Sequence, residues 1–498
     1  MCYTLDHSFA PLQKDTMPVS RENENTQNIT RMLQKGKTMD AVILAAGNST
    51  RFGENKLLYL LDGKPVYRYM LELLYQKQKE HRLRHIVLVS QYEQILNDVV
   101  QHFKGVQAVR NPKPEQGISS SLRLGLACLL RQEQEDRKAE APCSLAPGAC
   151  LFAVADQPGF TALSLEKLLD FWQSHSYGIV AAGMAKNRAD PSSGTDTKHS
   201  PVMKNPVIFS AQYYHELLGI TGDAGGKQVI RRHWEDTGIC SLPAADLDDL
   251  DTKEALRRFR QRSLLAREFP FLRQSGHVIS IVGAGGKTTL METLAACCAD
   301  FGKTSVITTT TRIMRPKKYP TAQTKEQLAS FLKQYPIVAA GADAPEGKLR
   351  MSEQMSVSDY QKAADFVWIE ADGAKHLPCK APIGTEPVIP KESDIVLGVA
   401  GMDALDMPLG EVCFRKEKAM ALLGVCERHR MTEQDLAQIL ISEQGTRKDV
   451  GSRAYYIVLN KCDDAKLRER AESIKELLLR AGAEHVACIS CIQGSIAQ

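Results

Sequence analysis

The sequence predicts an α/β protein made of two three-layer α/β/α domains, one in each half of the chain. Short apolar runs typical of buried strands, such as 41–44 and 85–90, alternate with helical patterns such as the one over 67–74. In each half, one apolar run leads into a glycine-rich turn, at 45–47 and at 283–286. This alternation implies parallel sheets with ligands at the carboxyl ends of the strands.

Composition restricts the classes of function. The 498 residues suffice for two or three domains, and a content of 43% hydrophobic and 24% charged residues is ordinary for a globular chain. A formal net charge of +4 argues neither for nor against nucleic acid. We see no apolar run of the roughly 18 residues that cross a bilayer and no secretory signal. Scattered cysteines indicate reduced thiols. The missing membrane span and secretory signal lead us to expect a cytoplasmic protein without membrane partners. Small molecules are its expected substrates, and nucleic acid is not an expected partner.

The pattern along the chain predicts where the domains end. Residues 1–38 are polar and aperiodic, which predicts a disordered extension. A first domain is expected over 39–257 and a second over 276–498. The basic stretch 258–275 between them is predicted to be a linker or a connecting helix. Within the first domain, 187–199 is predicted to be a mobile loop.

The first glycine turn has the residues of a nucleotide loop. Small residues at the end of a strand let backbone N–H groups approach a nucleotide closely, and an arginine and a lysine that follow can neutralise a polyphosphate. A plain glycine turn between strand and helix is the alternative. The loop comprises Leu44, Ala45, Ala46, Gly47, Arg51 and Lys56.

Three later segments of the same half carry polar groups where a nucleotide site needs them. Asn111 is followed by Gly117 and Ser121 at a helix start, an arrangement that caps a helix or binds an anion. Asp156 ends an apolar strand and Asp223 lies in a glycine loop. One or two such carboxylates commonly hold Mg²⁺ with a triphosphate, although an aspartate at a strand end is more often a turn residue.

The pattern L-A-A-G-x-S-x-R-x-G-x-x-K over 44–56 resembles the signature of the MobA-like nucleotidyltransferases. Its Ala-Ala-Gly is similar to that of the cytidylyltransferases that act on the molybdenum cofactor. The resemblance implies a Rossmann-like domain in which Asp156 and Asp223 bind Mg²⁺. Lys227 stands where that family has arginine, which keeps the charge but loses the bidentate fork. Asp249 and Asp251 match its D-x-D-T segment, with an acidic helix cap as the alternative.

The same resemblance implies an activity. CMP from CTP would be joined to the molybdopterin form of the molybdenum cofactor, and pyrophosphate would leave. Arg51, Lys56 and Asp156 would be the catalytic residues. A sugar or polyol phosphate nucleotidyltransferase shares the loop and the carboxylates and is the alternative within enzymes.

The second half begins with a strand, a glycine loop and a helix. The amide groups of such a turn can bind phosphates, Lys287 can reach the outer phosphates, and the Thr288 hydroxyl can hold Mg²⁺. The first glycine of the usual P-loop spacing would fall at Ile281, so the loop must be shorter or folded differently. The residues of the turn are Gly283, Gly285, Gly286, Lys287, Thr288 and Thr289.

Polar residues at the ends of two later predicted strands are typical of a P-loop-like NTPase domain. Glu370 and Asp372 lie at a strand end, where such proteins carry a metal-directed acid. Asn460, Lys461 and Asp463 resemble the guanine-reading N-K-x-D motif. GTP or ATP is therefore the expected ligand.

Together, GAGGKTT, EADGAKHLPCKAP and LNKCD resemble the YqeC family, accessory proteins associated with selenium-dependent molybdenum hydroxylases. The resemblance implies a role in maturation, with such a hydroxylase as the client. The sequence does not establish a reaction for this half. A nucleotide-gated maturation chaperone that hydrolyses slowly or not at all is the alternative.

Overall fold

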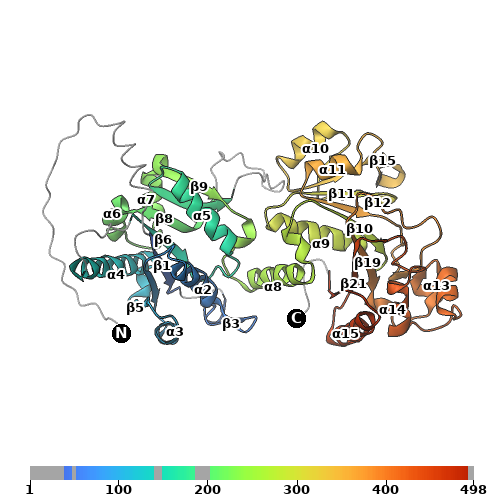
Figure 1. The fold of residues 1–498 in the computed structure, drawn as a ribbon, viewed down its shortest axis with the longest axis horizontal. Coiled ribbons are helices and arrows are strands. Elements are labelled where there is room, and N and C mark those ends of the chain that lie inside the picture. Colours follow the sequence, from blue (N-terminus) through green and yellow to red (C-terminus); the bar gives the residue numbers. More distant parts are fainter. Residues whose placement is uncertain (1–38, 48–51, 140–147, 185–201, 492–498) are drawn as a thin grey trace. The chain divides into compact units, whose positions relative to one another are not determined.

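The computed structural model describes residues 39–47, 52–139, 148–184 and 202–491 (Figure 1). The chain divides into two compact units that meet in sequence between Leu256 and Arg257. Helix α8 (Lys253–Glu268) spans that point and covers much of the predicted linker. The predicted extension 1–38 and loop 187–199 lie outside the described residues.

A seven-stranded sheet forms the centre of the first unit. Neighbouring strands are parallel except that β8 is antiparallel to both of its neighbours, β6 and β7. The expected fully parallel sheet is therefore wrong at this point, because consecutive strands β7 and β8 pair directly with each other. In sheet order the strands are β5 (Val106–Arg110), β4 (Ile86–Ser90), β1 (Met39–Ala45), β6 (Ala149–Val154), β8 (Val202–Ser210), β7 (Ile179–Met184) and β9 (Thr237–Ser241), and β2 (Leu60–Leu61) pairs with β3 (Lys64–Pro65) outside the sheet.

Helices cover both faces of this sheet, which makes three layers (Figure 1). Successive side chains of β1 alternate between two cores because a strand has a side-chain period of two. Ala41 and Ile43 lie in one core, and Val42 lies in the other. The first core contains α2 (Val66–Lys79), α3 (Glu93–His102) and α5 (Ala162–Ser174), and the second contains α4 (Ile118–Ala139), α6 (Tyr214–Leu218) and α7 (Lys227–Arg232).

An eight-stranded sheet, parallel at every pairing, forms the centre of the second unit. Strand β10, which precedes the glycine loop, lies between β17 and β19. In sheet order the strands are β13 (Thr321–Ala322), β14 (Ile337–Ala340), β11 (Ser305–Thr309), β17 (Phe366–Glu370), β10 (His277–Gly283), β19 (Ile395–Gly401), β21 (Ala454–Asn460) and β22 (His485–Cys488). Smaller sheets consist of β12 (Arg312–Met314), β16 (Lys348–Arg350) and β15 (Ala342–Ala344), and of β18 (Cys379–Lys380) and β20 (Cys413–Phe414).

The second unit also has three layers. Helix α9 (Lys287–Asp300) packs on the face that carries Ile279 and Ile281. The opposite face, which carries Val278 and Ile457, is covered by α10, α11, α14 and α15. No helix among the described residues is both long and apolar enough to cross a bilayer. The remaining helices are α10 (Lys325–Leu332), α11 (Val357–Ala363), α12 (Leu409–Val412), α13 (Lys416–Leu423), α14 (Glu433–Ile441) and α15 (Ala465–Arg480).

Candidate functional site

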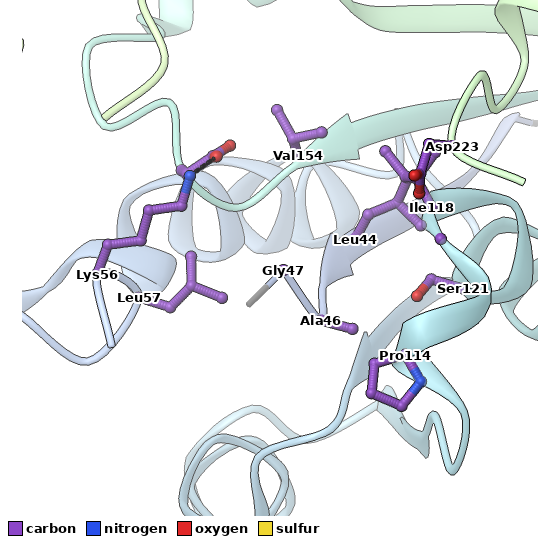
Figure 2. Close-up of a pocket in the computed structure, with 12 residues that line it drawn as sticks. Leu44, Ala46, Gly47, Lys56, Leu57, Pro114, Ile118, Ser121, Val154 and Asp223 are labelled. Carbon is purple, nitrogen blue, oxygen red and sulfur yellow. Dashed lines mark hydrogen bonds and ion pairs between the residues drawn. The ribbon is translucent and has the colours of Figure 1, made fainter. Parts of the chain in front are cut away.

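The first unit has a cavity of about 270 Å³ at the carboxyl ends of β1 and β6. The turn after β1, the start of α4, the end of β6 with Asp156 beyond it, and the loop before α7 all contribute to its wall. Figure 2 shows Lys56 and Asp223 on opposite sides of the opening, with Gly47 between them. The lining residues are Leu44, Ala46, Gly47, Lys56, Leu57, Pro114, Gly117, Ile118, Ser121, Val154, Asp156 and Asp223.

Side chains at the end of β4 and directly after it hold the turn after β1 in place. The Gln91 amide donates to the Ala46 carbonyl at 2.8 Å, and the Tyr92 hydroxyl donates to the Gly47 carbonyl at 2.9 Å. Ser90 donates to the Ala45 carbonyl at 2.8 Å. With these carbonyls bound behind the turn, its small residues present backbone to the cavity.

Buried hydrogen bonds fix the start of α4. The Asn111 side-chain amide donates to the hydroxyls of Ser120 at 2.9 Å and Ser121 at 2.8 Å. The amide of Ser119 donates to the carbonyl of Gly222 at 3.3 Å, which ties this loop to the one that carries Asp223. Asn111 thus positions the wall of the cavity from behind rather than lining it.

Lys56 is the centre of charge in this cavity. Its ammonium group lies 2.5 Å from an Asp156 oxygen and 2.6 Å from an Asp251 oxygen. Burial by itself would lower the pKa of Lys56, but the two carboxylates outweigh burial and the pKa is raised. The lysine therefore stays charged at neutral pH, where it can neutralise either the carboxylates or a phosphate.

The structure places a third carboxylate, that of Asp249, near Asp156 but outside the lining of the cavity. Asp249 accepts from the Gln157 amide at 2.9 Å and pairs with Lys204 at 3.3 Å. Burial and the nearby charge of Asp156 raise the pKa of Asp249, against the effect of Lys204. The family segment that Asp249 and Asp251 match implies no role for either residue. Their contacts with residues 45 to 195 positions away have no local signal in the sequence.

The structure brings most of the predicted residues of this half to the cavity wall, and Ala45 is buried behind it. Arg51 lies outside the described residues. The described residues contain no group of three or more acidic, histidine or cysteine side chains that could hold a metal ion. Asp156 and Asp223, predicted to share Mg²⁺, both line the cavity. The Asp156 carboxylate forms an ion pair with Lys56, whereas that of Asp223 lies beside Gly117.

In the second unit, the glycine turn packs closely against its neighbours. A side chain at Gly285, which has φ +79, would overlap the backbone of Gly401. The amides of Ala284 and Gly285 donate to the carbonyls of Val399 at 2.9 Å and Leu377 at 3.0 Å. The amide of Gly283 donates to Asp372 at 3.1 Å.

The expected phosphate cradle is therefore smaller than that of the usual P-loop. Among the described residues, the backbone N–H groups from Gly286 to Thr289 have no acceptor. These four groups form the first turn of α9, where the helix dipole favours an anion. This is the physical consequence of the shorter spacing seen in the sequence.

Lys287 is turned back into its own loop. It donates to the Gly283 carbonyl at 2.7 Å and lies 3.1 Å from Asp372 and 3.8 Å from Glu370. The Thr288 hydroxyl donates to Glu370 at 2.7 Å. Burial raises the pKa of Glu370, although Lys287 and Thr288 oppose the shift. A hydroxyl paired with a carboxylate is a donor set that fits Mg²⁺.

A second cavity, of about 480 Å³, adjoins this loop. The buried Asn460 amide donates to the Gly285 carbonyl at 2.8 Å, while its own oxygen has no partner. Lys461 pairs with Asp403 at 2.6 Å, and Asp463 accepts from Ser490 at 2.6 Å. The lining residues are Gly286, Thr289, Asp403, Asn460, Lys461, Asp463 and Cys491.

Comparisons with known proteins assign a different family to each half of the chain. The family model for the MobA-like NTP transferase domain matches residues 41–237, and the model for YqeC protein matches residues 279–417. The uncharacterized protein YqeC of Escherichia coli (strain K12) is 30% identical over 200 residues, which are 38% of this chain and 78% of that protein. These matches confirm both family resemblances.

The solved structures that resemble this chain have low TM-scores against it. Rv0371c from Mycobacterium tuberculosis H37Rv has a TM-score of 0.32 at 19% identity and covers 45% of this chain and 97% of its own. The bifunctional IspDF from Campylobacter jejuni has a TM-score of 0.35 at 14% identity, covering 45% and 54%. At these scores the likeness carries no conclusion. From the family matches, this chain belongs to the YqeC family and carries a MobA-like NTP transferase domain, with its nucleotidyltransferase activity, ahead of the YqeC domain.

Proposed function

We propose that the MobA-like half transfers CMP from CTP to the molybdopterin form of the molybdenum cofactor and releases pyrophosphate. One observation carries the transfer chemistry: a single cavity is lined by the turn after β1, the start of α4, Lys56 and Asp156. The choice of cytosine and pterin is supported by the resemblance of Ala45, Ala46 and Gly47 to the cofactor cytidylyltransferases.

The proposed reaction is an in-line displacement at phosphorus. A terminal phosphate oxygen of the pterin forms a bond to the α-phosphorus of CTP, and the α–β anhydride bond breaks, so that pyrophosphate leaves with the bonding electrons. A phosphate nucleophile is already ionised and needs no general base. Lys56, which two carboxylates keep charged, would neutralise the triphosphate, and the turn after β1 would orient it.

Mg²⁺ fits the donors at this end of the cavity. Because the described residues hold no ready cluster of three ligands, the ion would use one or two carboxylates and complete its shell with phosphate and water oxygens. When bound, it would neutralise charge on the leaving pyrophosphate. Asp156 is the proposed main ligand. There are two candidates for the second ligand. One is Asp249, whose pKa is raised by burial and by the charge of Asp156, and the other is Asp223 across the cavity.

The first experiment measures pyrophosphate release with each of the four nucleoside triphosphates and the pterin cofactor, with mass spectrometry of the product. With the cofactor present, release is expected from CTP and not from the other three nucleoside triphosphates. The rate should fall at least a hundredfold in Asp156→Asn. The control Asp170→Asn changes an exposed carboxylate and should keep full activity. Equal turnover of GTP would refute the assignment of the base.

Titration of Mg²⁺ separates the two candidate second ligands. The half-saturating Mg²⁺ concentration should rise in Asp249→Asn if that residue shares the ion, and in Asp223→Asn if the ion bridges the cavity. Activity that survives removal of divalent ions with a chelator would contradict a metal-assisted transfer.

A sugar or polyol phosphate is the alternative acceptor, since the same phosphate-directed groups would serve it. Screening such phosphates against the pterin under the same assay decides between them. Product formed from a sugar phosphate and CTP, with none from the pterin, would replace the first proposal.

For the YqeC half we propose a second nucleotide site that serves maturation of a molybdenum hydroxylase. The free amides at the start of α9 lie beside the cavity that Asn460 lines, and the buried side-chain oxygen of Asn460 has no hydrogen-bond partner. GTP would place its phosphates on α9 and its base near Asp463, with Thr288 and Glu370 available to Mg²⁺. Binding of methylanthraniloyl-GTP in excess CTP should be lost in Lys287→Ala.

Turnover decides between an NTPase and a slow, nucleotide-gated chaperone. GTP hydrolysis is measured with the protein alone and with an apo-hydroxylase. If Lys287→Ala changes neither nucleotide binding nor activation of the hydroxylase, the loop has only a structural role.

A further inference from the structure

The YqeC half contains a wholly enclosed lysine, which lies in the EADGAKHLPCKAP stretch and has so far been given no role. The side chain of Lys380, in β18, has 0% exposure. Its ammonium group lies 3.1 Å from Asp372 and 2.8 Å from Glu386, and it donates to the Gly373 carbonyl at 2.7 Å. A charge buried to this extent is retained only with strong partners. One of these partners, Asp372, also contacts Lys287 and the Gly283 amide of the glycine loop.

Asp372 joins the two lysines of this region. It is 1% exposed, and it faces Lys287 at 3.1 Å on one side and Lys380 at 3.1 Å on the other. The oxygen nearest Lys287 makes no hydrogen bond, whereas the other accepts from the Gly283 amide at 3.1 Å. The contact between Lys287 and Asp372 is thus an ion pair without a hydrogen bond, so charge alone holds this lysine to the carboxylate.

Phosphates at the start of α9 require Lys287 to leave this carboxylate. If Lys287 turned toward a ligand, Asp372 would keep only the Gly283 amide and Lys380. A buried carboxylate without any cation is strongly unfavourable, so Lys380 determines whether Lys287 can be released. Lys380 itself is anchored, since it also contacts Glu386, which pairs with Arg415 at 3.5 Å.

We propose that Lys380 is a positioning residue of the second nucleotide site. It compensates Asp372 so that Lys287 can exchange this internal carboxylate for the phosphates of a nucleoside triphosphate. This inference rests on the proposed function of the YqeC half. Asp372, in this arrangement, acts as the internal competitor of the ligand.

The experiment titrates methylanthraniloyl-GTP into the full-length protein with excess CTP present to fill the first site. Lys380→Met should weaken binding about tenfold or more, because Asp372 then holds Lys287 alone. Asp372→Asn should bind at least as tightly as the unchanged protein. The double change Lys380→Met with Asp372→Asn should restore binding, which a general packing defect at position 380 would not do.

Lys448→Met is the matched control. Lys448 donates to the carbonyls of Gly384 and Glu386, so it supports the same segment without touching Asp372. Its removal should leave GTP affinity unchanged. A tenfold loss there would show that any loosening of the segment weakens binding, and would overturn the inference.

The outcomes separate two failures. No binding by the unchanged protein would overturn both the second nucleotide site and this inference. Normal binding by Lys380→Met, or a double variant as weak as the single one, would overturn the inference alone. If Lys380→Met does not fold, Asp372→Asn decides, since weaker binding in that variant contradicts the role of Asp372 as competitor.

Discussion

Replacing Lys56 by methionine tests the charge balance of the nucleotidyltransferase cavity. Removing one partner of a fully buried ion pair costs about 3–5 kcal/mol. The Asp156 side chain is 19% exposed and that of Asp251 is 51% exposed, so solvent offsets part of this cost. We expect a loss of about 2 kcal/mol, which lowers the melting temperature by about 4–8 °C in a unit of this size.

Scanning calorimetry without nucleotide or divalent ions measures this loss. The double change Lys56→Met with Asp156→Asn should recover most of the stability, because it removes the uncompensated carboxylate. The control Lys64→Met removes a half-exposed ion pair with Glu72 and should cost less than about 1 kcal/mol. An unchanged melting temperature in Lys56→Met would refute the reasoning that Asp156 depends on this lysine.

The pH dependence of the same stabilisation has a definite sign. Burial opposes the charge of Lys56, but Asp156 and Asp251 outweigh it and raise the pKa above 10.5. Stabilisation by this group is therefore complete below pH 10.5 and is lost as pH rises through the folded-state pKa. The difference in stability between the unchanged protein and Lys56→Met should be constant from pH 7 to 9.

Further tests address other parts of the molecule. Gly117→Ala should lower kcat/KM more than tenfold, because a Cβ would displace the loop of Asp223, whereas Gly63→Ala, at a similar φ with open space, should keep activity in the pyrophosphate assay. Burial raises the pKa of Asp394, but its bonds to His277 and the Val278 amide lower it overall. Asp394→Asn should reduce stability at pH 7 and flatten its fall below pH 3.8 in urea unfolding. Peptide mapping after iodoacetamide treatment should find the exposed Cys426 labelled.

The sequence by itself predicted the local elements on which both halves depend. The runs at 41–44 and 277–282 are largely apolar and mark buried strands, and the glycines that follow are typical of tight turns. Family resemblance to MobA-like and YqeC proteins also follows from these short stretches, because a phosphate-directed turn needs particular residues at fixed spacing. The α/β class and its two-part organisation were therefore accessible without coordinates.

Only the tertiary structure decided which charges meet. Lys56 meets Asp251 across 195 positions, and Lys287 meets Asp372, which follows a different strand of the second sheet. The antiparallel placement of β8 and the occupied amides of the glycine loop were equally invisible. The physical reason is that strand pairing and buried ion pairs arise from contacts between distant segments, whereas propensity and motif spacing act over a few neighbouring residues.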